Sequence, residues 1–368
     1  MSDECRFRGR PIEPRRIKPN ATVEELMEFK AGTFGEARNL AAGAKLYRTM
    51  IDEGDTIWLG VSGIAAVGGL GGVISQLIEA GFIDVICSTG AQVYHDLHFA
   101  WGLPLHQTSP KADDDELRKR GLTRIYDCLI EEEATLEAQD DIIQRFVADT
   151  RLYDDTKPPT FGEPLSTAEF NHRLGAYTRE HAPRPERSFL ATAAEYDVPV
   201  FMDSAANHSI GLSLAKLSID GKVVELSASR DINQSAAIVY GSNKTGFVEL
   251  GGGGSKNFIQ QTSPHNSQIL RLPFEGADRG LQITTASERD GGLSGCTFGE
   301  GVTWGKYKAA DPLKLVQIWG EYSAFFPDIV SYVLGQCKPR TPRHLMNDLP
   351  TLTSNLEEEY RKTQAAGS

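Results

Sequence analysis

The segment from Glu300 to Lys306, Glu-Gly-Val-Thr-Trp-Gly-Lys, has the residue types of this chain best suited to covalent chemistry. A lysine in a partly dry site loses its charge more easily than one in water, and the neutral amine can attack an imine or a carbonyl. The Trp304 indole can cover an aliphatic chain or contact a cation through its face. Glu300 adds a negative group that can hold an amine. Together these residues suit chemistry on a polyamine.

The elements that must position these residues begin with a strand–helix–strand pattern. Residues 56–61 and 83–88 are predicted strands, and residues 71–80 are a predicted helix between them. This spacing suits a parallel pair of strands joined by a crossover helix. Ligands of open parallel sheets lie beyond the carboxyl ends of the strands. We therefore expect ligand contacts at Ser62-Gly63 and at Ser88-Thr89-Gly90.

The rest of the chain alternates between predicted helices and strands. Helices are predicted over 23–34, 40–53, 134–150 and 167–181 and from Lys256 onward, and strands over 198–202, 236–239 and 246–250. The charged stretch 107–122 is predicted to be a solvated loop with a helix start, 151–164 a connection, and residues 1–20 a flexible arm. With no internal repeat or clear boundary, we expect an N-terminal arm and short helix over 1–35 and a single domain over 36–368.

A glycine loop, Leu-Gly-Gly-Gly-Gly-Ser-Lys, runs from Leu250 to Lys256. It is not a P-loop, because Gly-Lys-Ser/Thr is missing at the required offset, and Gly68 to Gly72 does not satisfy GxGxxG. A bare glycine loop at a helix start lets backbone N–H groups face phosphates. A tight strand-to-helix turn without a ligand is equally compatible with these residues.

Composition narrows the function classes. The net charge of −12 and pI of about 5.2 argue against a nucleic-acid partner, which needs a basic face, and are compatible with a cationic substrate. The five cysteines are scattered without a CxxC pair, so we expect no zinc site or disulfide framework. His95 and His98 lack an obvious third ligand, so no metal is expected.

No targeting or membrane segment is expected. The N-terminus is polar and lacks an apolar signal core, and the apolar stretch 57–86 is interrupted by glycines, Glu79 and Asp84. We therefore expect no membrane partner and a cytoplasmic location.

The segment from Asp290 to Lys306, DGGLSGCTFGEGVTWGK, resembles the active-site segment of deoxyhypusine synthases and of the related homospermidine synthases. Further blocks in the same order resemble this family: Trp58–Gly60, Ile83–Ala91, Leu250–Asn257, Gly276–Asp278 and Ile283–Ala286. The resemblance runs from about Phe29 to about Phe326. It implies an α/β fold, Rossmann-like and doubly wound, with a mainly parallel sheet, helices on both faces, and NAD as cofactor.

The resemblance also implies roles for individual residues. Lys306 corresponds to the covalent nucleophile that carries an aminobutyl imine, and Lys256 to a supporting lysine. The implied substrate-binding residues are Glu300, Trp304, Asn257, His95 and His208. The implied cofactor-binding residues are Ser62, Gly63, Thr89, Gly90, Asp203, Gly252, Gly253, Thr285, Ala286, Asp290 and Glu321.

Several positions depart from the family pattern. Asn257 stands where a histidine is usual, and Leu293 and His208 stand where acids are usual. His95 replaces a glutamate, and Glu321 replaces an aspartate. Because carboxylates recognise ammonium groups, their loss alters how the charged ends of a triamine would be held. We therefore expect the core chemistry to be retained and the substrate set to have changed.

The resemblance implies NAD-dependent transfer of the butylamine part of a polyamine such as spermidine, through an imine on Lys306, to an amine acceptor. The departures favour a small diamine as acceptor. Two alternatives stay open: a true deoxyhypusine synthase that modifies a lysine of a translation factor, and an NAD-binding protein without transfer activity. The resemblance further implies a homotetramer with active sites between paired subunits.

Overall fold

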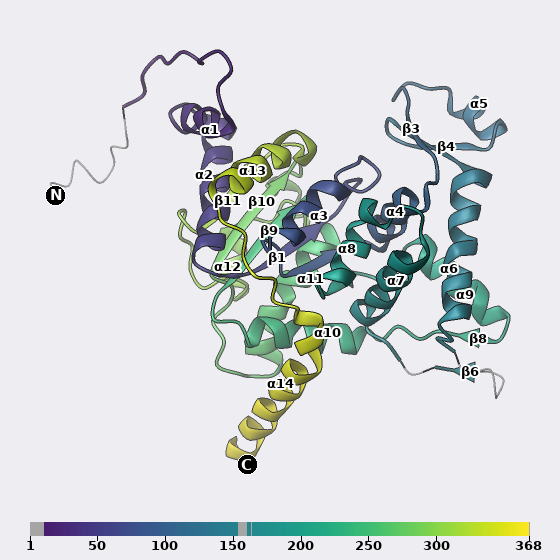
Figure 1. Ribbon diagram of the computed structural model, residues 1–368. Coiled ribbons are helices and arrows are strands. Elements are labelled where there is room, and N and C mark those ends of the chain that lie inside the picture. The colour runs from purple at the N-terminus through teal and green to yellow at the C-terminus, as the bar shows by residue number, and fades with distance from the viewer. Residues whose placement is uncertain (1–10, 154–159, 163, 368) are drawn as a thin grey trace.

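The computed structural model describes residues 11–153, 160–162 and 164–367, and its centre is a six-stranded sheet. The strands are β1 (Thr56–Val61), β2 (Val85–Ser88), β7 (Val200–Met202), β9 (Thr245–Leu250), β10 (Arg279–Thr284) and β11 (Leu315–Trp319). They lie in the order β11-β10-β9-β1-β2-β7, and every neighbouring pair is parallel (Figure 1). The chain builds outward from β1 on one side and from β9 on the other. The topological switch point therefore lies between β1 and β9, as in a Rossmann fold.

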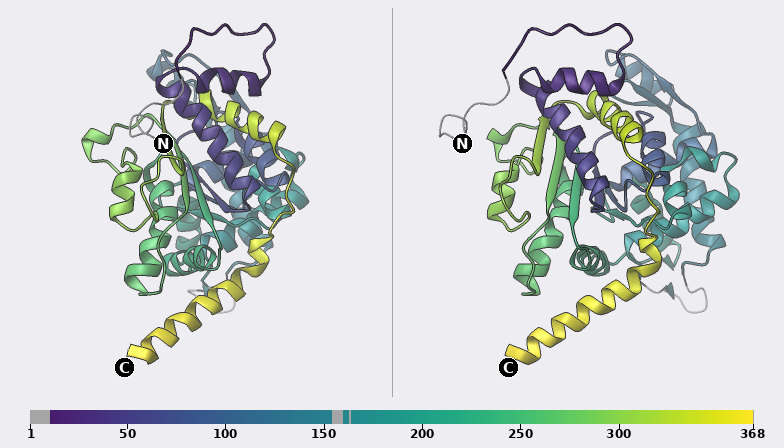
Figure 2. Two further views of the ribbon diagram at one scale, coloured as in Figure 1. Left: turned by 90° about the vertical axis from the view of Figure 1, so that its left-hand side faces the viewer. Right: turned by 60° about the vertical axis from the view of Figure 1, so that its left-hand side comes forward.

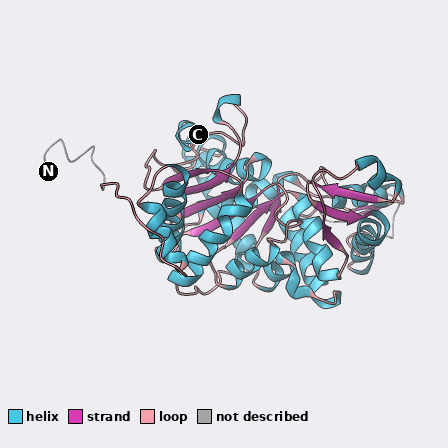
Figure 3. Cartoon of the chain, turned by 90° about the horizontal axis from the view of Figure 1, so that it is seen from above, coloured by secondary structure: helices cyan, strands magenta, loops and turns pink. Residues whose placement is uncertain are grey.

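Helices cover both faces of this sheet, which the view from above shows directly (Figure 3). Successive side chains of a strand point to opposite faces, so both faces need apolar residues. In β1, Ile57, Leu59 and Val61 join one hydrophobic core, and Trp58 joins the other. The predicted α/β fold class is confirmed by this arrangement.

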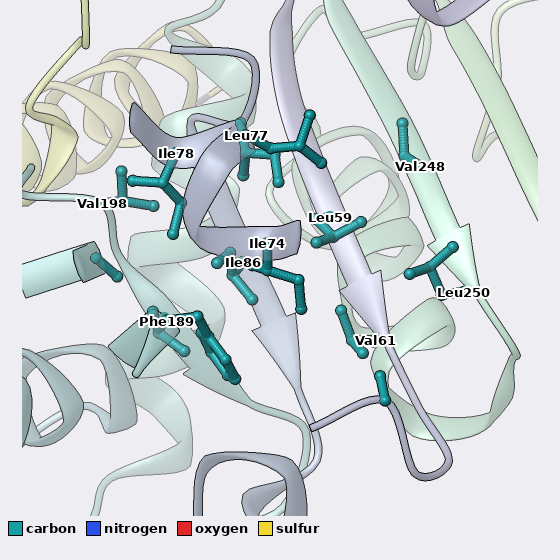
Figure 4. Packing of buried hydrophobic residues seen from close by; sticks show 14 of the residues in the cluster. Leu59, Val61, Ile74, Leu77, Ile78, Ile86, Phe189, Val198, Val248 and Leu250 are labelled. Carbon is teal, nitrogen blue, oxygen red and sulfur yellow. The ribbon is translucent and has the colours of Figure 1, made fainter. Parts of the chain in front are cut away.

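The first face is covered by α2 (Gly35–Asp52), α3 (Gly71–Glu79), α8 (Phe189–Glu195) and α13 (Tyr322–Gln336). Leu59 of β1 and Ile86 of β2 pack against Ile74 and Ile78 of α3 (Figure 4). The crossover helix predicted between the two strands is thus confirmed, and it is one of the four helices that bury this face.

The second face is covered by α10 (Ala228–Tyr240), α11 (Gly253–Pro264) and α12 (Phe298–Thr303). The C-terminal helix α14 (Leu345–Gly367) packs its first half on α10 through Leu349 and Leu356, and then runs away from the body (Figure 2). The strand predicted over residues 236–239 is wrong, because Ala-Ala-Ile-Val forms part of α10. A four-residue apolar run does not distinguish a strand from the buried turn of a helix.

The N-terminal helix α1 (Val23–Ala31) begins at a capping box formed by Thr22 and Glu25 and packs on α2 and α13 with Met27 buried. Residues 11–22 form no helix or strand. The first ten residues of the predicted arm lie outside the described residues.

The β2–β7 side of the sheet carries α4 (Gly90–Trp101), α6 (Ala138–Asp149), α7 (Thr167–His181) and α9 (Ser209–Ile219). A π-helical turn, Glu132–Glu137, leads into α6. The predicted connection 151–164 contains β6 (Thr160–Phe161), which pairs with β8 (Lys222–Val223). The part of that connection at 154–159 and 163 lies outside the described residues.

A small antiparallel sheet stands apart from the main one, at the upper right of Figure 1. Its strands β3 (Leu105–Gln107), β5 (Cys128–Glu131) and β4 (Leu122–Ile125) lie in that spatial order, and α5 (Asp114–Lys119) precedes β4. The helix start predicted within the charged stretch 107–122 is confirmed. These strands were not predicted, because each is only 3 or 4 residues long and therefore shows no periodic pattern.

Buried ion pairs close the amino end of the main sheet. The Arg279 guanidinium, at the start of β10, lies 2.6 Å from both carboxylate oxygens of Asp55 and 2.5 Å from Glu53 Oε2. Asp84, just before β2, accepts a hydrogen bond from the Ile57 N–H at 2.8 Å and pairs with Arg340 at 3.0 Å. These pairs join three strands to the segment that leads into α14.

Among the described residues, no helix combines the length and apolar character needed to cross a bilayer.

Candidate active site

A short helix and a tight turn fix the backbone of Lys306. Thr297 caps α12 by accepting a hydrogen bond from the Glu300 N–H at 3.2 Å, and the helix ends at Thr303, with Trp304 as its C-cap. Gly305 follows with φ of +69°, a left-handed conformation that glycine adopts without strain. The Lys306 N–H then donates to the Gly301 carbonyl at 3.0 Å, and the Lys306 carbonyl accepts from Ala277 at 3.0 Å. The backbone of Lys306 is therefore held on both sides.

The Lys306 side chain is buried, with 5% of the residue exposed. Its Nζ donates a hydrogen bond to Asn257 Oδ1 at 3.1 Å. Burial lowers the pKa of Lys306; Cys296, Glu249 and Glu300 oppose that effect. A lowered pKa increases the fraction of neutral amine near pH 7, which is the form that attacks an imine or a carbonyl.

Lys256, in the first turn of α11, is a second buried lysine of different character. Its Nζ donates to the Cys296 carbonyl at 2.7 Å and to Gln282 Oε1 at 3.0 Å, with the Ser294 carbonyl at 3.5 Å. Three oxygen acceptors match the three N–H donors of an ammonium group. Lys256 Nζ is therefore engaged by three protein acceptors, whereas Lys306 Nζ has the single acceptor Asn257 Oδ1 among the described residues.

Glu249, on β9, is the main residue of the site that sequence reasoning missed. It is 1% exposed, and its Oε1 accepts hydrogen bonds from Gln260 at 2.8 Å and from the Tyr307 hydroxyl at 3.1 Å. Its Oε2 has no hydrogen-bond partner within the described residues. Burial raises the pKa of Glu249, and the nearby Lys256 opposes that rise. The signal available in the sequence was an acid inside an apolar strand directly before the glycine loop.

Trp304 and Glu300 lie farther out than Lys306. Trp304 is 64% exposed and lines a pocket of about 440 Å³ together with Phe258 and Ile269. Glu300 is exposed, and its charge acts on both Lys306 and the Cys296 thiol. The structure therefore brings Glu300, Asn257 and Lys306 into one electrostatic neighbourhood, with the indole at its outer side.

The two predicted substrate histidines lie on the α4 and α9 side of the sheet. His95 Nδ1 is 3.0 Å from His98 Nε2, and burial lowers the pKa of His95 to about 4. His208 is the N-cap of α9: its Nδ1 accepts from the Gly211 N–H at 3.2 Å, and its Nε2 is 3.0 Å from the Ser204 carbonyl. Both ring nitrogens of His208 thus have protein partners, in the neutral tautomer with the proton on Nε2.

The His208 ring also lies directly over Gly90, the first residue of α4. A Cβ at Gly90 would come within 2.1 Å of the ring. Thr89, the preceding residue, caps α4 by accepting from the Gln92 N–H at 3.3 Å. The loop after β2 is therefore closely packed against α9.

The glycine loop after β9 faces the switch point. Ser62, after β1, donates a hydrogen bond to the Gly252 carbonyl at 2.5 Å. A Cβ added at Gly252 would lie 2.5 Å from the Ser294 Cα, and one at Gly254 would lie 2.1 Å from Asp203 Oδ2. Only a loop without side chains fits between these two neighbours.

α11 begins at this loop without a side-chain cap, and Gly251 and Gly253 have φ of +78° and +63°. The positive end of a helix beside bare backbone is a suitable site for a phosphate. Asp203 is half-buried beside the same loop, and burial raises its pKa. The backbone N–H donors of the loop therefore fit the phosphates of a dinucleotide, and the Asp203 carboxylate fits one of its hydroxyls as an acceptor.

The other predicted cofactor residues line two pockets near the carboxyl ends of the strands. Gly63 and Glu321 share a pocket of about 690 Å³ with Tyr322, and the Glu321 carboxylate also accepts from the Ser323 N–H at 2.9 Å. Thr285 and Ala286 share a second pocket, of about 550 Å³, with Gln317, Trp319 and Glu36.

Asp290 lies in an exposed turn, where its Oδ1 accepts from the Gly292 N–H at 2.6 Å. A carboxylate held in a turn of its own loop is a weaker candidate for ligand contact than Asp203.

An open parallel sheet with a Rossmann strand order, covered by helices on both faces, defines a doubly wound α/β protein. The chain belongs to the deoxyhypusine synthase family: the family model described as deoxyhypusine synthase matches residues 25–333.

Curated relatives agree over nearly the full length. The chain is 33% identical over 365 residues to a deoxyhypusine synthase-like protein of Thermosynechococcus vestitus, covering 96% of this chain and 88% of that protein. It is 34% identical over 330 residues to a probable deoxyhypusine synthase 2 of Methanosarcina acetivorans, covering 89% and 90%. The crystal structure of a putative deoxyhypusine synthase from Entamoeba histolytica has the same fold, with a TM-score of 0.57 at 18% identity over 88% of this chain and 96% of that one.

Proposed function

We propose that this protein is an NAD-dependent aminobutyl transferase that uses Lys306 as its nucleophile. The observation that carries the proposal is the burial of Lys306, with its pKa lowered, next to Asn257 and at the end of a segment that matches the family's active site. A lysine this buried is uncommon unless it is paired or used in chemistry.

NAD would lie over the switch point, held by the backbone of Gly252 and Gly253, by Ser62 and Gly63, and by the Asp203 carboxylate. The remaining predicted contacts are Thr89, Gly90, Thr285, Ala286, Asp290 and Glu321. When bound, NAD would take up a hydride from the carbon next to a secondary amine of the polyamine and return it to the product imine, so that the transfer has no net oxidation.

The protein's own residues do the rest. The neutral Lys306 amine attacks the imine carbon of the oxidised polyamine, a small diamine leaves with the proton that this step releases, and Lys306 holds an aminobutyl imine. A second amine then displaces Lys306 in the reverse exchange. Asn257 orients Nζ through its Oδ1, Trp304 covers the methylene chain, and Glu300 binds an ammonium group or relays the proton.

We propose a small diamine as the favoured acceptor. Leu293 offers no carboxylate, Asn257 is engaged with Lys306, and both ring nitrogens of His208 already have protein partners. These positions supply little charge to hold a larger polyamine or a protein lysine as the acceptor. Transfer to a lysine of a translation factor, and NAD binding without transfer, are the alternatives that acceptor screening separates.

We further propose that residues 36–368 work as one catalytic domain behind the N-terminal arm and short helix of 1–35, in a homotetramer whose active sites lie between paired subunits. The exposure of Trp304 and Glu300 supports this assembly, because a second subunit would complete the outer wall of the substrate site.

Borohydride trapping followed by intact-protein mass spectrometry tests the proposal. The protein would be incubated with NAD and spermidine and then reduced, alongside Lys306→Ala. The matched control is Lys308→Ala, which removes an exposed lysine two residues away that pairs with Asp278. We expect a butylamine-sized adduct on wild type and on the control variant, and none on Lys306→Ala.

An adduct that persists on Lys306→Ala would rule out Lys306 as the nucleophile. NAD binding without any adduct from spermidine or other polyamines would favour the binding protein that lacks transfer activity.

A further inference from the structure

Glu249 is a buried carboxylate to which the proposed reaction gives no role. It is the penultimate residue of β9, between Val248 and Leu250, at a position where a parallel sheet with both faces covered normally holds an apolar residue. A carboxylate in such a place costs several kcal/mol unless charge and hydrogen bonds compensate. Hydrogen bonds from Gln260 and Tyr307 reach only its Oε1. Because burial raises the pKa of Glu249, a nearby positive charge is what can hold this carboxyl in its ionised form.

Two lysines supply positive charge near Glu249. Lys256 is the stronger influence on the Glu249 carboxyl, and Lys306 is the weaker one. The three side chains are all at least 95% buried. One ammonium group is compensated by the one buried carboxylate. A positive charge on the second lysine would have no buried carboxylate to compensate it.

The hydrogen bonds identify which lysine that is. Lys256 Nζ faces three oxygen acceptors, whereas a single amide oxygen, from Asn257, is the recorded acceptor for Lys306 Nζ. The charged or ionisable groups that act on Lys306 are Cys296 from the preceding loop, Glu249 from β9, Lys256 from α11 and Glu300 from α12. Of these, Lys256 favours the neutral amine, whereas Cys296, Glu249 and Glu300 favour the ammonium form.

We propose that Glu249 and Lys256 act on Lys306 as two opposite buried charges, here called the charge pair, which together set its protonation state. Glu249 also accepts a hydrogen bond from the hydroxyl of the adjacent Tyr307 and so holds that ring in place. Glu249 and Lys256 are both positioning residues, since neither exchanges a bond with the substrate. The inference rests on the proposed function in one respect, that Lys306 is the nucleophile.

Competitive labelling with a trace of acetic anhydride tests this pair without any substrate. The full-length protein would be labelled between pH 6 and 11, and peptide mass spectrometry would compare Lys306 with the exposed Lys111 as internal reference. Glu249→Gln keeps the shape and the acceptor for Tyr307 but removes the charge. We expect its Lys306 labelling midpoint to fall by about half a pH unit, a threefold gain in neutral amine.

Lys256→Met should move the midpoint in the opposite direction by a similar amount, because Glu249 is then unopposed. The double variant should return close to wild type. Glu300→Gln is the matched control, since the same chemical change at an exposed carboxylate is screened by water and should move the midpoint less.

Midpoints that move in the same direction in Glu249→Gln and Lys256→Met, or that stay unchanged in variants with native thermal unfolding, would overturn the proposal. If Glu249→Gln fails to fold, Lys256→Met alone decides, and no upward shift would overturn it. The outcome is separate from that of borohydride trapping: opposite shifts without an adduct would contradict only the transfer reaction, and an adduct without shifts would contradict only the charge pair.

Discussion

The two ends of the main sheet both bury charged side chains, but they differ in how completely those charges are paired. At the amino end, Arg279 reaches both oxygens of Asp55 and one of Glu53, and Asp84 is shared by Arg340 and the Ile57 N–H. On the α11 side, toward the carboxyl ends, charge is left partly unmatched. Lys306 has one hydrogen-bond acceptor recorded for its Nζ, and Glu249 has an oxygen without a hydrogen-bond partner among the described residues.

This difference indicates which end is built for stability and which for chemistry. Matched pairs hold strands in register but have little tendency to change protonation state. A buried amine whose charge is poorly matched has a perturbed pKa, which is the property a nucleophile needs. Proteins tolerate such a site when the rest of the fold supplies the stability. Variants at the two ends should therefore behave in opposite ways.

The largest effect is expected from Arg279→Met, which leaves Asp55 buried without its partner. Removing one member of a buried pair costs about 3–5 kcal/mol, because the remaining charge is uncompensated. Urea unfolding of the variant should show that loss in the free energy of unfolding. Asp55→Asn in the Arg279→Met background should recover part of the loss. A cost below about 1 kcal/mol would show that the amino-end pairs do not carry the stability assigned to them.

The next effect concerns the glycine loop. Gly252→Ala places a Cβ 2.5 Å from the Ser294 Cα, so the loop must move away from the position that we assign to the dinucleotide phosphates. We expect the dissociation constant of NAD, measured by calorimetry, to rise at least about tenfold, or roughly 1.4 kcal/mol. Gly335→Ala is the matched control, because a Cβ there meets nothing within 4 Å. Equal NAD affinity in wild type and Gly252→Ala would remove this loop from the proposed cofactor site.

A smaller, several-fold effect is expected in the pH dependence of imine formation. Burial lowers the pKa of Lys306, so the neutral amine accumulates at a lower pH than it does for a lysine in water. The rate of adduct formation at saturating spermidine should rise with pH and level off below the range in which exposed lysines titrate. Stopped-time borohydride trapping from pH 6 to 10.5 measures this profile. A rate that keeps rising through pH 10.5 would show that Lys306 titrates like an exposed lysine.

Much of this comparison was accessible from the sequence. The strand–helix–strand pattern, the glycine loop and the run from Glu300 to Lys306 predicted the fold class and the lysine, because they depend on local residue order. The charge pair of Glu249 and Lys256 was not accessible. It joins residues seven positions apart on a strand and a helix to Lys306, and only the folded packing of β9, α11 and the turn at Gly305 brings them together. The strand prediction over residues 236–239 was wrong because burial on a helix gives the same short apolar run as burial in a strand.

The smallest effect is expected from Lys306→Met, which makes the same kind of replacement as Arg279→Met on the opposite side of the comparison. Burial disfavours the charged form of Lys306, so the native state binds this proton less tightly than the unfolded chain does. Removing the group should change the free energy of unfolding at pH 7 by about 1 kcal/mol or less, in the stabilising direction.

The sign of the pH dependence follows from the lowered pKa. The wild type loses the most free energy of unfolding, relative to the variant, at pH values below the pKa of Lys306 in the folded protein. This loss becomes smaller as the pH rises through that value toward the pKa of a lysine in the unfolded chain. Urea unfolding of both proteins at pH 6 and pH 9.5 should therefore show a larger advantage for the variant at pH 6. A loss of several kcal/mol, like that expected for Arg279→Met, would mean that Lys306 is a structural cation and that the two ends of the sheet do not differ in kind.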